Sequence, residues 1–114
     1  MKDCLFCRIA SGETPATVLM ADDHAVVFED IAPRAPTHLL VIPRRHLDSL
    51  AAAQEQDREL LGHLLATAAR AAREAGLEAP GYRVVLNTGT GAGQTVFHIH
   101  LHILGGRPLA WPPG

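Results

Sequence analysis

The spacing of apolar residues along the chain predicts two helices and five strands. Leucines and alanines recur every three or four residues between Gln56 and Ala75, as on one face of a long helix, and Gly76 follows as a stop signal. The apolar residues of Leu5–Ala10 predict a shorter helix that ends near Gly12. Apolar and β-branched runs bounded by turn residues predict strands over 17–20, 25–28, 38–42, 82–87 and 96–104.

This order of elements predicts an α+β fold in a single domain, residues 1–114. Parallel neighbours need crossover helices, and a chain with one long helix does not supply enough of them, so the five-stranded sheet is expected to be antiparallel. No repeat, low-complexity tract or linker divides the chain. Its 114 residues, 47% of them hydrophobic, suffice for one core.

Composition and charge narrow the classes of partner. Ten Lys and Arg residues against twelve Asp and Glu residues give a formal net charge of -2. A general nucleic-acid or anionic-membrane binder would need a basic face, so neither partner is expected. No apolar run approaches the roughly 20 residues that span a bilayer, and no apolar signal-peptide block is present. Two cysteines are too few for a disulfide framework. A cytoplasmic protein is therefore expected.

Histidine is the unusual residue, because three of the seven fall within five positions. In the expected strand 96–104, His98, His100 and His102 should project from one face. The other face should enter the core with Phe97, Ile99, Leu101 and Ile103. Three interpretations fit this pattern: a half-exposed strand that carries histidine by chance, a catalytic zinc site, and phosphoryl chemistry with a neutral imidazole as the nucleophile.

The segment before this strand favours phosphoryl chemistry. Three glycines within 89–93 allow backbone N–H groups to approach a phosphate closely. Neutral hydrogen-bonding side chains flank these glycines at Asn87, Gln94 and Thr95. A glycine-rich loop alone is weak evidence, but beside three histidines on one face it becomes part of a candidate phosphate site.

The segment 93–104 resembles the H-φ-H-φ-H-φ-φ signature of the histidine triad family. The resemblance extends back through 28–38 and 41–46 and forward through 105–107 to the ending 111–114, so it covers nearly the whole chain. That ending resembles the Hint branch, the purine nucleoside phosphoramidases. Related nucleotidyltransferases carry glutamine in place of the third histidine of the motif. His102 is present here, which favours hydrolysis.

The resemblance implies a hydrolase of purine nucleoside 5′-phosphoramidates, of the adenosine 5′-monophosphoramidase type, that needs no cofactor for catalysis. His100 would be the nucleophile and would form a nucleotidyl-histidine intermediate, with His102 and His38 as candidate acids for the leaving amine. The motif histidine His98 completes the predicted catalytic set. The alternative of a different class is a nucleotide-binding or interaction module with little turnover, and a metal-dependent hydrolase is a third.

The resemblance also implies which residues bind the substrate. Asp30 would accept hydrogen bonds from the ribose hydroxyls. The phosphate and the leaving group would be held by Asn87, Gln94 and Thr95. The purine base would be enclosed by Leu5, Phe6, Ile9, Phe28 and Ile31. Each assignment has a structural alternative: the apolar residues could be core, Asp30 a turn residue and His38 a satisfied core histidine.

Two residues depart from the family pattern. Thr95 stands where the branch usually has serine; the hydroxyl remains, but the extra methyl group can crowd the leaving group. Ala110 precedes Trp111 where the animal members have histidine.

A homodimer is expected, because one long helix on a five-stranded sheet leaves an apolar surface and a free edge. The resemblance adds that Trp111 of one subunit reaches the active site of the other.

Cys4 and Cys7 have the C-x₂-C spacing of half a zinc site. Some bacterial members of the family carry a Cys-Cys-His-His site, and the matching positions add His46 and His98 as ligands of a structural zinc. Residues two apart in a strand are about 6.6 Å apart, so His98 could serve a metal while His100 serves phosphate. A pair of ordinary buried thiols and a redox pair remain as alternatives.

Overall fold

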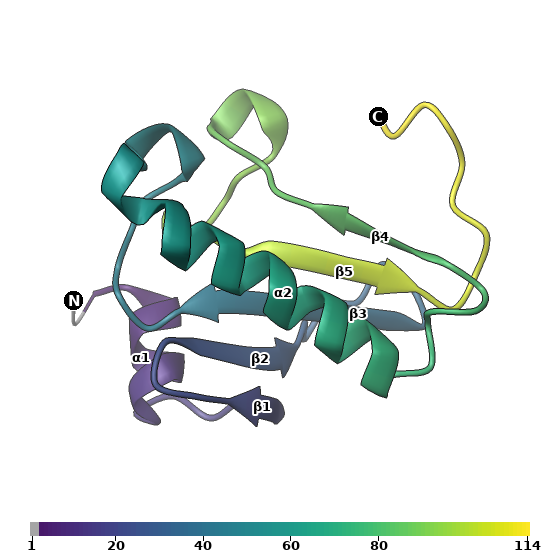
Figure 1. Ribbon diagram of the computed structural model, residues 1–114, viewed down its shortest axis with the longest axis horizontal. Coiled ribbons are helices and arrows are strands. Elements are labelled where there is room, and N and C mark those ends of the chain that lie inside the picture. The colour runs from purple at the N-terminus through teal and green to yellow at the C-terminus, as the bar shows by residue number, and fades with distance from the viewer. Residues whose placement is uncertain (1–2) are drawn as a thin grey trace.

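Five antiparallel strands form one sheet at the centre of the molecule (Figure 1). The computed structural model describes residues 3–114. The strands are β1 (Val18–Ala21), β2 (Ala25–Glu29), β3 (Thr37–Pro43), β4 (Tyr82–Val85) and β5 (Leu101–Gly105). Their order is β1-β2-β3-β5-β4, and every neighbouring pair is antiparallel. The predicted α+β fold is confirmed, and β5 lies directly beside β3.

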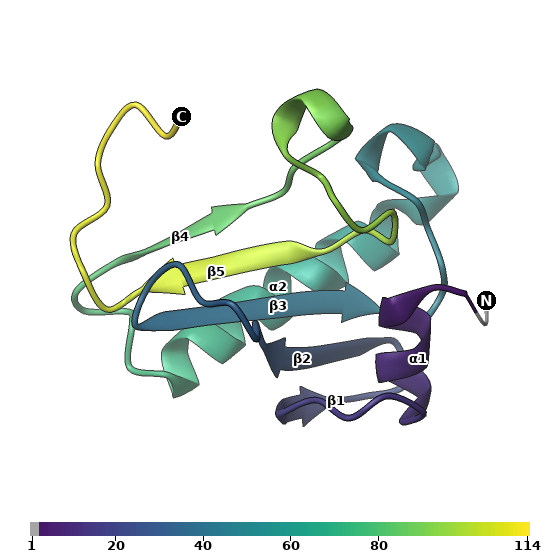
Figure 2. The ribbon, with the colours of Figure 1, turned by 180° about the vertical axis from the view of Figure 1, so that it is seen from behind.

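Two helices cover opposite faces of this sheet (Figures 1 and 2). Helix α1 (Leu5–Ser11) packs on one face and α2 (Arg58–Glu74) on the other. Successive residues of β3 alternate between the two faces: Leu39 and Val41 belong to the core beneath α2, whereas Leu40 and Ile42 belong to the core beneath α1. The period-2 alternation of a strand thus gives the α1 face its own, separate set of side chains.

Local side-chain contacts explain where the helices begin and end. The Sγ of Cys4 accepts the backbone N–H of Cys7 at the start of α1, and Gly12, with φ of 86°, ends that helix. The long helix was predicted to begin at Gln56, but a short 3-10 turn, η2 (Glu55–Asp57), occupies that position and α2 begins at Arg58. Similar turns are η1 (Leu50–Ala52) and η3 (Thr90–Ala92). None of the helices within residues 3–114 combines the length and apolar character needed to cross a membrane.

The predicted strand over 96–104 is wrong in its first half, because residues 96–98 bend and β5 begins only at Leu101. Bonds to the segment after β3 replace the sheet ladder there: the Ile99 N–H donates to the Leu47 carbonyl at 2.7 Å. Phe97 is consequently 46% exposed rather than in the core. The other predicted core residues of the segment are buried: Ile99, Leu101 and Ile103.

Two glycine substitutions should separate a crowded backbone position from an open one. At Gly106, φ is +92° and an added Cβ would lie 2.8 Å from Cβ of the rigid Pro36 ring. We expect Gly106→Ala to lower the free energy of unfolding by more than about 1 kcal/mol. The matched control, Gly62→Ala inside α2, meets nothing within 4 Å and should raise it by about 0.5–1 kcal/mol. Urea unfolding measures both, and equal effects would contradict the prediction.

Candidate active site and metal cluster

Three histidines line up on the α1 face of the sheet, where β3 and β5 are neighbours. His38 comes from β3 and His102 from β5, and the ladder pairs Leu40 with His102. The Nε2 of His38 lies 2.8 Å from Nδ1 of His102. His100, just before β5, places its ring centroid 5.0 Å from that of His102. The structure therefore brings three of the four predicted catalytic histidines into one row.

Hydrogen-bond partners indicate which nitrogen of each ring carries the proton. The Arg34 N–H donates to Nδ1 of His38 at 3.0 Å, so a neutral His38 has its hydrogen on Nε2 and donates it to His102. His102 then carries its own hydrogen on Nε2. The Nδ1 of His100 donates to the His98 carbonyl at 2.8 Å, which leaves the lone pair of His100 on Nε2. That lone pair is the form a nucleophile requires.

Burial favours the neutral form of these rings. Loss of hydration is the main cause that lowers the pKa of both His38 and His100 from the usual value. In His102, burial followed by the neighbouring His100 and His38 rings lowers the pKa to about 4. The three rings are therefore mainly neutral at pH 7.

An apolar cavity of about 280 Å³ opens beside His100 and His102. All the residues predicted to enclose a base line it, namely Leu5, Phe6, Ile9, Phe28 and Ile31. Phe6, Ile9 and Phe28 are also buried core residues, so each of them both lines the cavity and belongs to the core. Ile31 is 96% exposed and lies at the mouth. Sequence reasoning missed Thr14, Pro15, Ala16, Glu29, Leu40 and Val96 in the wall, since no motif marks them.

The sequence left open whether Asp30 is a turn residue or part of the candidate site, and in the structure its carboxylate contributes to both. Its Oδ1 accepts the Ala32 N–H at 2.8 Å, as in an Asx turn. Its Oδ2 lies 3.4 Å from Nε2 of His38, and the residue lines the cavity. One carboxylate oxygen thus shapes the loop while the other reaches the site.

The residues predicted to hold phosphate occupy different positions. Thr95 lines the cavity, whereas Asn87 is half-buried close to Gly93. Gln94 is 3% exposed, and its amide is engaged within the protein: Oε1 accepts the Gly89 N–H and Nε2 donates to the carbonyls of Asp48 and Val96. Gln94 therefore holds the shape of the glycine-rich loop.

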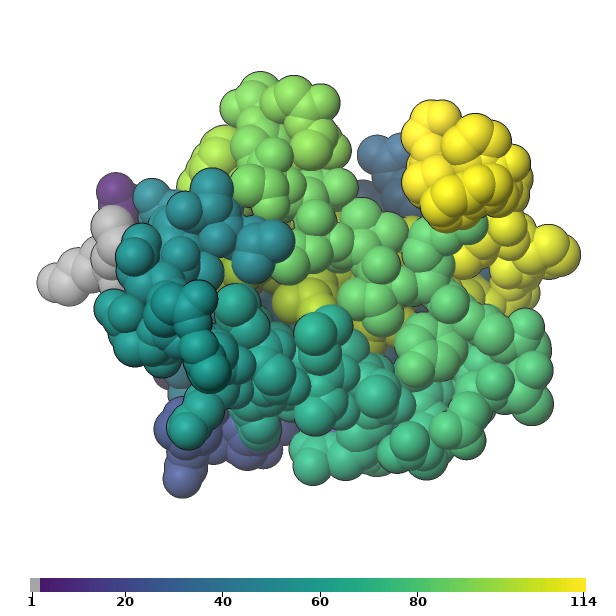
Figure 3. Space-filling model, turned by 45° about the horizontal axis from the view of Figure 1, so that its top comes forward, coloured from purple at the N-terminus to yellow at the C-terminus, as the bar shows by residue number. Residues whose placement is uncertain are grey.

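Trp111 lies in the C-terminal tail and is 81% exposed. In Figure 3 that end of the chain projects from the surface as a separate lobe. Its predicted contact with a partner's site stays a prediction.

A larger cleft of about 470 Å³ lies beside α2, and two of its polar groups have partners within the chain. Nε2 of His63 is 2.9 Å from a carboxylate oxygen of Asp22, and the Arg44 side chain donates to the Asp22 carbonyl. Hydrogen bonds to the Asp22 carboxyl, the strongest of them from the His24 N–H, hold the pKa of this carboxyl below its usual value. The smaller cavity beside the histidines is mainly apolar with a few polar groups, which is typical of a small-molecule site.

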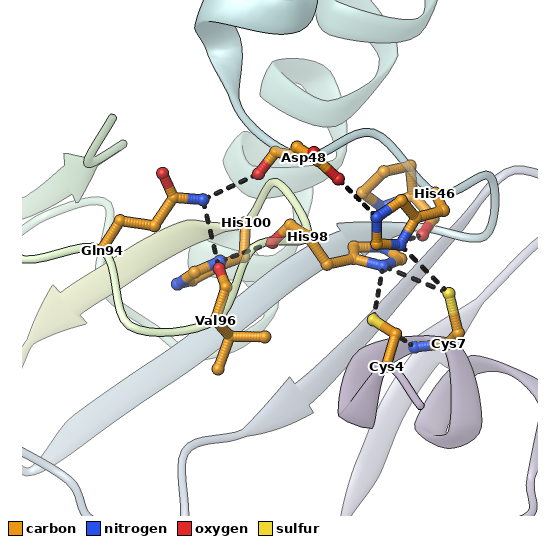
Figure 4. A network of polar contacts seen from close by, with 9 residues as sticks. Cys4, Cys7, His46, Asp48, Gln94, Val96, His98 and His100 are labelled. Atoms are coloured by element: carbon orange, nitrogen blue, oxygen red, sulfur yellow. Dashed lines mark hydrogen bonds and ion pairs between the residues drawn. The ribbon is translucent and has the colours of Figure 1, made fainter. Parts of the chain in front are cut away.

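Two thiols and two imidazoles converge where α1 meets the ends of β3 and β5 (Figure 4). Their ligand atoms all lie within 4.8 Å of one another. The Nδ1 of His98 is 3.4 Å from Sγ of Cys4 and 3.5 Å from Sγ of Cys7. The Nδ1 of His46 is 3.4 Å from Sγ of Cys7. The four residues predicted as metal ligands thus form one cluster, called the Cys–His cluster below.

The chemistry of the Cys–His cluster fits zinc. Nε2 of His98 bonds to the Pro43 carbonyl at 2.8 Å, and Nε2 of His46 lies 2.6 Å from Oδ1 of Asp48. Each ring therefore points the lone pair of Nδ1 at the sulfurs. Two sulfur and two nitrogen donors with supported second nitrogens are typical of a tetrahedral structural zinc site. Both cysteines are free thiols, and burial is the main cause that raises the pKa of Cys7.

Comparison with known proteins now decides the family. The HIT domain family matches residues 11–109. The chain belongs to the HIT domain family. It is 49% identical over 113 residues to an uncharacterized HIT-like protein of Synechococcus elongatus, a match that covers 99% of this chain and 98% of that protein.

Solved structures of HIT proteins share the whole fold. A HIT family hydrolase from Legionella pneumophila is 51% identical with a TM-score of 0.97, over 98% of this chain and all of that one (100%). A histidine triad protein from Clostridium difficile is 40% identical with a TM-score of 0.94, over 96% of each chain. The predicted family is confirmed, and the fold is that of the HIT hydrolases.

The depressed pKa of His102 makes stability depend on pH. The unfolded chain takes up a proton at this position near the ordinary value of 6.5, whereas the folded HIT domain does so only at about 4. Stability is therefore complete above about pH 6.5 and is lost as the pH falls toward 4. We expect His102→Gln to lose less stability than the wild type between these limits.

Thermal unfolding across that pH range measures the loss of stability. The quantity compared between variants is the slope of the melting temperature against pH, rather than the melting temperature itself. His24→Gln replaces an exposed histidine outside the site and serves as the control. The same slope in His102→Gln and the wild type would contradict the prediction.

Proposed function

We propose that this HIT protein hydrolyses purine nucleoside 5′-phosphoramidates through a nucleotidyl intermediate on His100. The observation that carries the proposal is the hydrogen bond from His100 Nδ1 to the His98 carbonyl, which leaves a lone pair on Nε2 of a residue that lines the apolar cavity. A neutral, oriented imidazole can attack phosphorus at pH near 7 without prior ionisation. Solved relatives described as HIT family hydrolases support the reaction class.

The first step forms a bond from Nε2 of His100 to the α-phosphorus and breaks the bond from phosphorus to the leaving amine. The amine must take up a proton as it leaves. His102 lines the cavity and has its hydrogen on Nε2, and an anionic phosphate beside it raises its pKa from the low value of the free site. We propose that His102 takes up a proton when the substrate binds and gives that proton to the amine.

The second step reverses these roles. Water attacks the phosphorus, the neutral His102 accepts a proton from that water, and the bond from phosphorus to His100 breaks, which releases the nucleoside monophosphate. In the resting site, the Nε2–H of His38 donates to Nδ1 of His102 and holds that ring in place. Proton transfer by one group in both directions is general acid and base catalysis.

The cavity supports the choice of a nucleoside. Phe6 and Phe28, whose ring centroids are 5.6 Å apart, offer flat apolar surface for a purine. The second carboxylate oxygen of Asp30 can accept hydrogen bonds from ribose hydroxyls, and the Thr95 hydroxyl can donate to the phosphate or the leaving group.

We expect His100→Ala to abolish turnover of adenosine 5′-phosphoramidate while it leaves binding of AMP largely intact. The substitution removes the nucleophile, whereas the apolar walls and Asp30 supply most ground-state contact. Steady-state kinetics and calorimetry measure the two properties, with His24→Ala as a control at an exposed histidine. Retention of more than about a tenth of the wild-type kcat, a loss under about 1.4 kcal/mol, would show that His100 is not the nucleophile. Binding without turnover in the wild type would instead favour a nucleotide-binding module.

We also propose that the Cys–His cluster holds a structural zinc, which when bound cross-links α1 to the sheet. Elemental analysis of protein purified without chelator should give close to one zinc per chain. Cys4→Ser removes one of two sulfur ligands and should lose the metal, whereas Ser11→Ala, at an exposed position of the same helix, should keep it. Metal-free wild-type protein with two titratable thiols would refute the zinc site and leave the phosphoramidase proposal standing.

A homodimer through the β4 edge is the third part of the proposal. Tyr82 and Val84 on this edge are each 37% exposed, and the nearby tail is tied to β4 by a bond from Arg83 to the Ala110 carbonyl. An interface on this side would bring Trp111 close to the partner's site.

Light scattering should therefore give twice the 12.2 kDa monomer mass at micromolar concentration. Val84→Arg should shift the mass toward the monomer, since it adds a charge to the interface. Leu19→Arg on the opposite edge strand, β1, where Leu19 is 49% exposed, should not. A wild-type monomer would contradict the dimer.

A further inference from the structure

Two chains of contacts lead away from the Cys–His cluster, one to His100 and one to Gln94 beside the glycine-rich loop, and Figure 4 shows both. The first passes through His98, which has no exposed surface. Its ring lies between the sulfurs on one side and the Pro43 carbonyl on the other, and its own carbonyl accepts Nδ1–H of His100 at 2.8 Å. The residue that would bind the metal therefore also orients the nucleophile.

The second chain passes through Asp48. Its carboxylate lies 2.6 Å from Nε2 of His46, and its carbonyl accepts Nε2–H of Gln94 at 2.7 Å. The Oε1 of Gln94 in turn accepts the Gly89 N–H at 2.8 Å. Asp48 thus joins a cluster ligand to the glycine-rich loop that flanks the histidine site.

The segment that carries these groups has little support from the sheet. Residues 94–100 lie outside the strand ladder. The segment is held instead by the Gln94 side chain, the His98 ring and the Ile99 N–H, which bond to carbonyls of the segment 43–48. Phe6, from the helix that carries both thiols, contacts the His98 ring at 6.0 Å and the His100 ring at 5.0 Å between centroids. A change at the cluster would therefore reach the nucleophile through packed groups.

We propose that metal binding at the Cys–His cluster and nucleotide binding at the histidine site are coupled, with Asp48 as a positioning residue that joins them. The nucleotide in this statement rests on the proposed function. The coupling is reciprocal: if zinc tightens AMP binding by some factor, AMP tightens zinc binding by the same factor.

The direct test compares the zinc-loaded and the metal-free full-length chain. We expect AMP to bind about five- to tenfold more weakly to the metal-free chain by calorimetry, within the usual range of coupling between sites. The ¹⁵N chemical shifts of His100 should show a single tautomer with zinc and a mixture without it. The proposal is overturned if the folded metal-free chain keeps the AMP affinity within about twofold and also the same His100 shifts.

Asp48 variants test the second chain in protein that keeps its metal. Loss of a carboxylate behind a histidine ligand typically weakens metal binding about 10–100-fold, and we expect this of Asp48→Ala together with weaker AMP binding. Asp48→Asn retains an oxygen that can accept the His46 Nε2–H and should restore most of both affinities. Asp23→Ala, which removes an equal charge at another exposed position, should change neither. Asp48→Ala with wild-type affinity for zinc and for AMP would refute its positioning role.

Failure of the coupling and failure of the proposed function give different results. If no form of the chain binds AMP, the nucleotide function fails, and the His100 shifts decide whether the cluster still orients the nucleophile. If the metal-free chain does not stay folded, the AMP affinity and the His100 shifts of zinc-loaded Asp48→Ala decide the same question.

Discussion

The buried ring of His98 is the constraint on which both sites depend. Its Nε2 bonds to the carbonyl at the end of β3, its Nδ1 faces two thiols, and its carbonyl accepts the hydrogen of His100. An imidazole without exposed surface must satisfy its polar atoms inside the protein, and these contacts do so. They also require residues 96–98 to leave the sheet, which turns His98 toward the cluster while His100 and His102 stay beside the cavity.

Burial then determines the charge of the site. Desolvation lowers the pKa of His38, His100 and His102, so the free protein presents lone pairs rather than cations at neutral pH. A protonated nucleophile could not attack, and a permanently charged site would already have drawn in counter-ions. In the proposed mechanism, an anionic substrate would supply the charge that raises the pKa of His102, and protonation of this acid would then depend on bound substrate.

Periodic patterns in the sequence were sufficient to predict most of the fold. The periodic spacing of apolar residues predicts helix α2, whereas β2 and β3 are predicted as continuous apolar runs bounded by turn residues. The pattern of alternating histidine and apolar residues failed at Phe97, because a bend stabilised by long-range hydrogen bonds can carry the same local alternation. The family was recognisable from the same motif and is confirmed by the match over 11–109.

The sequence alone does not predict contacts between residues that are far apart along the chain. The metal ligands could be proposed only because Cys4 and Cys7 have a recognisable spacing and a family resemblance supplied the histidines. Asp48 has no such signal: its partner Gln94 lies 46 positions away and contacts its backbone, for which no residue type is required. The partners of the Gln94 amide were equally hidden, and its predicted role as a phosphate ligand stays a prediction.

Helix α1 links these observations, because one short segment serves both sites. Cys4 caps the helix and Cys7 follows one turn later, and both sulfurs face the Cys–His cluster. Phe6 lies between them in sequence yet points into the core, against Phe28 and the rings of His98 and His100. A helix that presents alternate residues to two neighbouring sites cannot shift at one without moving the wall of the other. The position of the thiols therefore bears on the shape of the apolar cavity as well as on the attachment of the N-terminal segment to the sheet.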